Sequence, residues 1–271
     1  MKARILFFTV LTILLSNTVH AAQSDPWSGF GTTPERARLA SVMEKSLSAY
    51  ASVNDYQAVF HKQERSGGTL GPDETIFLKF EKPFKIFMSW MDTRKKGLQV
   101  LYERGKHDGK LAIHQPGLLL GLAPVIFLEP NSPWVKEGSE SYDIEDAGIG
   151  SFLDDFAAAL LKGAAENKLA VTGTTEALGD TADVTFKGSL ENDGYFAYRV
   201  RVHFNRTNAL PDRMELFDWQ GRPMGVYVYD DLKLNIGAKD DEFQKIAHRK
   251  LIRLYDPPLK TQTGTNFASK S

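Results

Sequence analysis

The sequence of 271 residues contains no cysteine. This absence excludes disulfide frameworks, thiolate metal sites, iron–sulfur clusters, cysteine nucleophiles and a lipid anchor carried on an N-terminal cysteine. An excess of one charge sign is also lacking, because 33 Lys and Arg stand against 34 Asp and Glu. A nucleic-acid binder that works through bulk positive charge is therefore excluded. With 42% hydrophobic residues, the composition indicates a folded chain rather than a disordered one.

Long hydrophobic runs are absent beyond the first residues. Lys2 and Arg4 precede an apolar stretch at 5–15, and the small residues Ala21 and Ala22 follow it. This order is typical of a cleaved signal peptide, and the stretch is shorter than the roughly 20 residues that span a bilayer. We therefore expect removal of residues 1–21 and export to the periplasm of a Gram-negative bacterium. An uncleaved membrane anchor is the alternative.

Catalytic signatures are missing as well. The sequence has no GxSxG elbow, P-loop, GxGxxG or HExxH, and its histidines are scattered singly. Adjacent Asp pairs occur at 154–155, 230–231 and 240–241. Neighbouring residues diverge on a helix or a strand, so such a pair cannot share one substrate through adjacency alone. We expect no cofactor and no metal, and an enzyme is the weakest of three functional hypotheses.

Two segments show helical spacing of apolar residues. One helix is expected at 34–50, where Thr32 and Glu35 have capping-box spacing. The other is expected at 151–166, with an N-cap at Ser151. The remainder of the chain is dominated by a period of two, which predicts strands.

The expected strands are joined by connections too short for parallel crossovers. The prediction is an α+β fold, mainly antiparallel, with ten or eleven strands and two main helices. We expect one domain over 22–255, a mobile apolar loop with at most one short helix at 117–141, and a disordered tail at 256–271. The strands are expected to begin near Tyr56 and to include 76–80, 84–90, 98–102, 111–114, 169–175, 183–187, 195–204, 213–219 and 224–234.

Several strings, in this order, resemble the DUF1571 family within the LolA/LolB-like superfamily of periplasmic lipoprotein carriers. They are FHKQER (60–65), FLKFEKPFKIFMSW (77–90), LQVLYERGKHDGKLAIHQPG (98–117), IEDAGIGSF (144–152) and DLKLNIGAKDDEF (231–243). The resemblance implies an unclosed, strongly curved β-barrel covered by helices, with an apolar cavity that takes acyl chains. It also draws attention to Lys82, which precedes a proline at a position where the carriers have a basic residue, usually Arg.

Large apolar residues recur on one face of three consecutive strands. Such a set either fills a core or lines a ligand cavity, because a soluble protein rarely exposes a large contiguous apolar patch. The carrier resemblance favours the cavity. The candidate ligand-binding residues on the concave face are Phe60, Leu78, Phe80, Ile86, Met88 and Trp90.

The leading functional hypothesis is a non-enzymatic periplasmic binding or carrier protein. Its cargo would be an acylated ligand: a lipid, a lipoprotein or a lipid-linked glycan. The alternative is an envelope interaction or sensor module that docks an inner- or outer-membrane partner protein. A docking face for that partner would be built from Arg199, Arg201, Arg206 and Arg213, although such a cluster is more often a solvated strand face.

Overall fold

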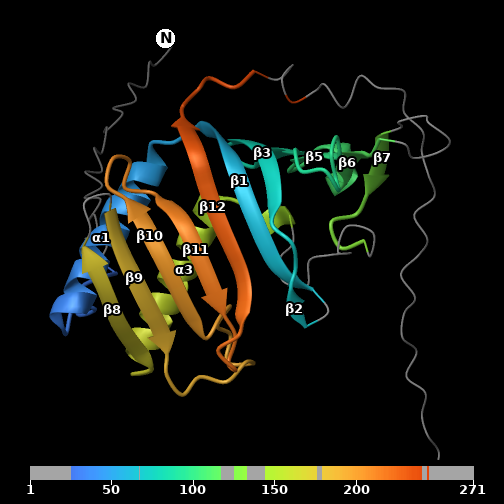
Figure 1. Ribbon diagram of the computed structural model, residues 1–271. Helices are drawn as coiled ribbons and strands as arrows, with labels where there is room; N and C mark the ends of the chain where they lie inside the picture. Colours follow the sequence, from blue (N-terminus) through green and yellow to red (C-terminus); the bar gives the residue numbers. More distant parts are fainter. Residues whose placement is uncertain are drawn as a thin grey trace, which may run out of the picture.

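The computed structural model describes residues 26–66, 68–116, 125–132, 144–175, 179–239 and Phe243. The expected signal peptide and the expected C-terminal tail lie outside these residues. The described strands form one antiparallel sheet in the order β7-β6-β5-β4-β3-β1-β12-β11-β10-β9-β8, with the short β2 paired to β1. The sheet is curled and unclosed, and two α-helices lie behind it in Figure 1. The predicted fold class is therefore confirmed.

The elements follow the chain almost as the periodicity indicates. The helices are α1 (Pro34–Ala51) and α3 (Ile149–Ala165), with short 3₁₀ turns η1 (His107–Gly109) and η2 (Ile144–Asp146). The strands are β1 (Asp55–Ser66), β2 (Thr69–Leu70), β3 (Glu74–Glu81), β4 (Lys85–Trp90), β5 (Gln99–Glu103), β6 (Leu111–His114), β7 (Val125–Leu128), β8 (Leu169–Thr175), β9 (Gly179–Phe186), β10 (Arg199–Asn205), β11 (Pro211–Phe217) and β12 (Pro223–Leu234).

The expected loop at 117–141 is wrong over part of its length. Val125–Leu128 forms β7, which pairs with β6 and ends the sheet. A run of four apolar residues between prolines carries no periodicity that would separate a buried strand from an apolar loop. The remainder of that stretch, apart from 129–132, lies outside the described residues. Together with β2, β7 brings the sheet to twelve strands, above the predicted ten or eleven.

The predicted helix caps were each misplaced. The N-cap of α1 is Thr33, whose side chain accepts a hydrogen bond from the Arg36 amide, rather than its neighbour Thr32. The N-cap of α3 is Gly148, so Ser151 lies inside the helix. Gly148 offers no side-chain oxygen, and the buried Tyr56 hydroxyl instead accepts from the Ile149 amide at 3.2 Å.

A glycine is required at position 148 for two reasons. Its φ is +112°, a region that side chains with a Cβ rarely adopt. A Cβ there would also lie 3.1 Å from the Tyr56 hydroxyl. Gly148, within the string IEDAGIGSF, thus allows β1 and the start of α3 to come into contact.

The sheet has two different faces. We call the face toward α1 and α3 the inner face, and the opposite one the outer face. The helices contact each other and β8, so they lie behind the β8–β12 half of the sheet (Figure 1). Inner-face side chains from β1 and β3 to β12 join both helices in one large hydrophobic core. Among the described residues, no helix combines the length and the apolar composition needed to cross a bilayer.

Candidate functional site

All six candidate apolar residues point to the inner face and are buried. Register explains why they meet: Phe60 pairs with Ile76, Leu78 with Met88, Phe80 with Ile86, and Ile76 with Trp90. Each pair lies side by side on one face of an antiparallel ladder. The six therefore form one continuous apolar surface across β1, β3 and β4, within the main core.

On four strands of the inner face, burial falls toward one end. Along β4, Ile86 is 0% exposed, Met88 8% and Trp90 9%. Along β1, exposure rises in the same direction from 0% at Tyr56 to 7% at Phe60. β5 and β6 follow the same trend, because Val100, the register partner of Met88, and Ile113, the partner of Val100, are more exposed than Tyr102 and Leu111. β3 and β7 run the other way, since exposure is 0% at Ile76 and 4% at Phe80, and 4% at Ile126 and 7% at Leu128. We call the end near the start of α3 the sealed end, and the opposite end, where β1, β4, β5 and β6 are more exposed, the looser end.

The sealed end is built from aromatic rings. Tyr56 stacks on Phe80 with ring centroids 5.1 Å apart, and Phe80 meets Phe84 edge to face. Burial raises the pKa of Tyr56 well above its usual value, and that of Tyr229 likewise. These hydroxyls therefore remain protonated at neutral pH.

A polar cluster, which we call the rim cluster, lies at the looser end. Strand alternation places Glu74 two residues before Ile76 on the same face, and it continues the face of Phe60 to Lys62 and Glu64. Lys62 and Glu74 are register partners. The rim cluster consists of Lys62, Glu64, Glu74, Trp90, Lys95 and Tyr227.

Each carboxylate of the rim cluster holds one lysine and one aromatic donor. Glu74 accepts from the Trp90 indole N–H at 2.8 Å and pairs with Lys95. Glu64 accepts from the Tyr227 hydroxyl at 3.0 Å and pairs with Lys62 at 3.1 Å. Burial alone would raise the pKa of Glu74, but the hydrogen bonds from Lys95 and Trp90 outweigh it and hold the pKa below its usual value. Both buried acids are therefore neutralised locally.

The rim cluster was missed from the sequence. A signal was nevertheless present, because Glu74, Lys62 and Glu64 occupy inward positions of strands whose other inward residues are apolar. Buried charges of this kind are uncommon unless they are paired. The partner Lys95 comes from the turn between β4 and β5, and no local pattern connects it with Glu74.

Lys82 lies away from the rim cluster, at the sealed end. Its ammonium donates to the Tyr50 carbonyl at 2.7 Å and lies over the Tyr50 ring, 4.2 Å from the centroid. It also reaches the Ala51 carbonyl at 3.4 Å. A cation at this place satisfies the last carbonyls of α1 and complements the helix dipole. Lys82 thus joins the turn between β3 and β4 to the end of α1.

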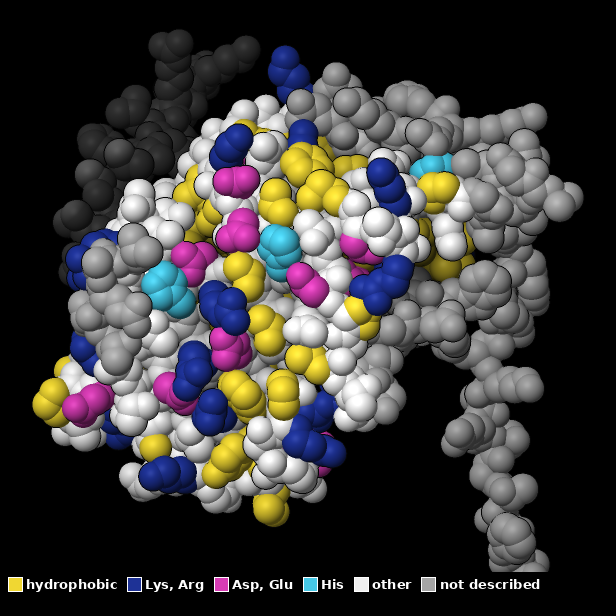
Figure 2. All heavy atoms as spheres, in the orientation of Figure 1, with side chains coloured by type: hydrophobic (Ala, Val, Ile, Leu, Met, Phe, Trp, Pro, Cys, Tyr) yellow, Lys and Arg dark blue, Asp and Glu magenta, His cyan; other side chains and the backbone are white. Residues whose placement is uncertain are grey.

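Three of the four arginines of the alternative docking face form local ion pairs on the outer face. Arg201 donates to Asp183 at 2.8 and 3.0 Å, and Arg213 donates to Glu215 at 2.8 Å. Arg199 lies 3.4 Å from Asp183. Figure 2 shows this face, where basic and acidic side chains are interspersed with apolar ones. The geometry is that of a solvated strand face with balanced charge. Arg206 lies in the turn after β10.

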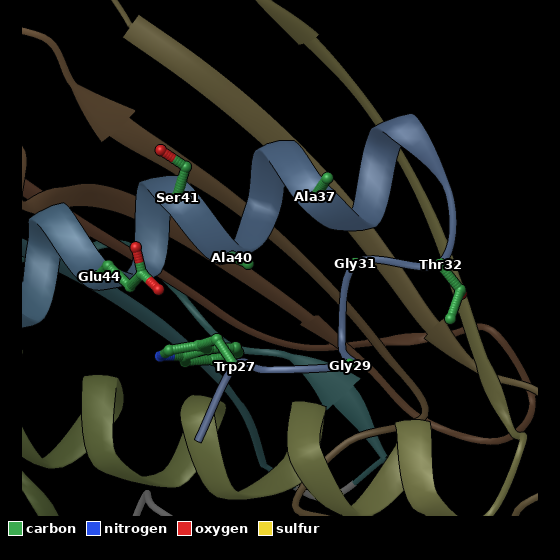
Figure 3. A pocket seen from close by; sticks show the side chains of 8 residues that line it. All are labelled: Trp27, Gly29, Gly31, Thr32, Ala37, Ala40, Ser41 and Glu44. Atoms are coloured by element: carbon green, nitrogen blue, oxygen red, sulfur yellow. The ribbon is translucent and has the colours of Figure 1, made fainter. Parts of the chain in front are cut away.

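A separate hollow of about 390 Å³ lies beside α1 (Figure 3). It is open because glycine and alanine form much of its wall, and the Trp27 ring lies between α1 and the neighbouring helix. None of the six candidate apolar residues lines it. Its lining residues are Trp27, Gly29, Gly31, Thr32, Ala37, Ala40, Ser41 and Glu44. In the part of the chain that the structure describes, no group of three or more His, Asp or Glu is placed to hold a metal ion.

The model of the family described as "Protein of unknown function (DUF1571)" matches residues 53–250. The chain belongs to this family. The match begins just before β1 and runs past Phe243, so it covers the whole described sheet. The assignment made from the ordered strings is confirmed.

Solved structures with similar folds are distant in sequence. The Pseudomonas aeruginosa MucA/MucB complex matches at 13% identity and a TM-score of 0.43, over 79% of this chain and 63% of that one. A LolA superfamily protein from Nitrosomonas europaea matches at 13% identity and 0.36, over 76% and 96%. The Mycobacterium tuberculosis lipoprotein LppX matches at 10% and 0.39, over 75% and 98%. The chain thus spans less than two thirds of the matched chain of the MucA/MucB complex. A search of curated proteins gives no match.

Proposed function

We propose that this DUF1571 protein is a non-enzymatic periplasmic carrier or binding protein for an acylated ligand. The acyl chain lies on the inner face, against Phe60, Leu78, Phe80, Ile86, Met88 and Trp90. The observation that carries the proposal is the burial gradient on β1, β4, β5 and β6, where exposure rises toward the same end. An apolar surface that is sealed at one end and looser at the other has the form of a site entered from one side.

The energetics of such a site suit a carrier. Burial contributes roughly 0.8 kcal/mol per CH₂ group, so the affinity grows steadily with chain length. An acyl chain inserted from the looser end meets Trp90, Phe60 and Met88 first and the ring stack of Tyr56 and Phe80 last. Met88 is suited to this place, because its unbranched thioether adapts to ligands of irregular shape.

The first test is mass spectrometry of organic extracts from the purified mature protein. The proposal predicts a stoichiometric acylated compound that remains through gel filtration. It also predicts saturable binding of a fluorescent fatty-acid probe to delipidated protein. A protein that yields no lipid and shows no saturable probe binding would contradict the proposal.

A matched pair of substitutions locates the site. Met88→Glu places a charge on the inner face of β4 and should abolish probe binding while the β signal in circular dichroism persists. Thr185→Glu places the same charge on the outer face of β9, in the half of the sheet whose outer face is solvated, and should leave binding intact. If Met88→Glu simply unfolds the protein, the face is packed core rather than a cavity.

A further inference from the structure

We infer that the ligand carries a zwitterionic head group, with a phosphate and a primary ammonium, and that the rim cluster binds it. This inference rests on the proposed function and adds to it the chemical class of the ligand. The rim cluster lies at the looser end of the inner face, next to Phe60 and Trp90. A ligand whose chain points toward the sealed end leaves its polar head at this place.

The charges of the rim cluster sum to zero. Lys62 and Lys95 stand against Glu64 and Glu74, and both carboxylates are buried, with 5% and 11% of their side-chain surface exposed. Removing one partner of a buried ion pair leaves an uncompensated charge, which costs more free energy than the pair contributes. A ligand whose anionic group draws both lysines away would leave Glu64 and Glu74 as buried charges without a partner.

A zwitterion avoids this cost. Its phosphate can accept hydrogen bonds from Lys62 and Lys95, while its ammonium donates to Glu64 and Glu74. Each protein charge then exchanges one partner for another of the same sign, and no buried charge is left alone. A purely anionic head satisfies only the lysines, and a purely cationic head only the glutamates.

Aromatic rings beside the carboxylates favour the ammonium in particular. The Phe60 and Tyr227 rings are nearly parallel, 9° apart, with centroids at 6.3 Å, and the Trp90 indole is bonded to Glu74. A cation near an aromatic face gains electrostatic attraction from the ring. The Lys95 ammonium already lies 5.9 Å from the Trp90 centroid, which shows that a cation is stable beside this ring.

The test compares monomeric single-chain lipids that share one acyl chain and differ in the head. Delipidated mature protein with bound fluorescent fatty acid is titrated with lysophosphatidylethanolamine, lysophosphatidylglycerol and the alkylammonium of equal chain length. We expect the zwitterionic lipid to displace the probe at a concentration about tenfold lower than either of the others, as one pair of charge-assisted bonds would give. Free phosphoethanolamine, which lacks the chain, should not displace it.

Two variants sharpen the comparison. Glu74→Gln removes a partner of the ammonium and should shift the preference toward lysophosphatidylglycerol. Lys95→Gln removes a partner of the phosphate and should shift it toward the alkylammonium. Should either variant fail to fold, the comparison of the three lipids on the wild-type protein still tests the head-group inference.

Failures of the two proposals are distinguishable. Equal displacement by all three lipids, with saturable binding, would overturn the head-group inference and leave the acyl site standing. Stronger binding of the purely anionic lipid would overturn it as well. Absence of saturable binding by any lipid or probe would overturn both.

Discussion

The two halves of the sheet bury their surfaces in different ways. In the β8–β12 half, β10 alternates between buried inner residues and outer residues that carry charge, such as Arg201. In the β3–β7 half, β6 is buried at all four positions and β7 at three of four. Strands buried on both faces give continuous apolar sequence, whereas strands with one wet face alternate. The halves therefore differ in what covers their outer face.

A second, smaller core covers the outer face of the β3–β7 half. It contains Phe87, Leu101, Ala112 and Val125, together with Phe243 from the chain after β12. The Lys85 ammonium lies 4.3 Å from the centroid of the Phe243 ring. The segment after β12 thus contributes a buried aromatic ring to a core whose other members are strand residues. Apart from Phe60 on β1, the proposed ligand surface therefore lies on a half of the sheet whose outer face is covered by a second core.

The largest difference in stability between the two halves should appear when a charge is placed on the outer face of each. Ala112→Asp buries a carboxylate in the second core and should cost about 4 kcal/mol or more, enough to unfold many domains. Thr185→Asp lies on the outer face of β9, beside Arg199, and should change stability by less than about 0.5 kcal/mol. Chemical denaturation of both variants measures the difference. Equal losses would show that the two outer faces are equally buried.

The second-largest loss of stability is expected from Phe243→Ala. It removes the buried ring that joins the segment after β12 to the sheet, so we expect a loss of about 3–5 kcal/mol in the free energy of unfolding. Leu190→Ala is the control, because Leu190 is 65% exposed and its loss should be near zero. A Phe243→Ala variant as stable as the wild type would mean that the second core contributes little.

Glu74→Gln should have a smaller effect, and that effect should depend on pH. The pKa of Glu74 in the folded protein lies below its usual 4.5, so its contribution is complete above that pH and is lost as the pH falls below it. At pH 7 we expect a loss of about 1–3 kcal/mol, because hydrogen bonds to a charged, buried group are weakened. The difference between wild type and variant should shrink in acid. Glu191→Gln, on an exposed loop, should show neither effect.

The smallest effect is expected on the outer face of the β8–β12 half. Arg201→Ala breaks exposed ion pairs with Asp183 and should cost about 0.2–1 kcal/mol, and less at high salt. Thermal melts at low and high ionic strength measure this. A loss of several kcal/mol would contradict the description of this face as solvated.

The sequence predicted much of the fold because alternation and helical spacing are local. The inner positions of Phe60, Leu78 and Met88 followed from a period of two, and the ordered strings identified the family. Burial of the β3–β7 half on both of its faces could not be predicted, because the contact of Phe243 with β4 joins residues far apart in the chain. The same limit applies to the rim cluster, where Lys95 reaches Glu74 from another turn. The predicted N-cap of α1 was wrong by one residue because Thr32 and Thr33 have the same chemistry.

The central claim is that the inner face near Met88 receives an acyl chain. It is tested most directly by NMR of protein labelled at the methionine methyl groups, with the Met88 signal assigned through Met88→Leu. A fatty acid carrying a nitroxide on its chain broadens only nearby methyl signals. The account predicts that the Met88 signal is lost at saturation and returns when the nitroxide is reduced. An unchanged Met88 signal in the presence of saturating, bound ligand would contradict it.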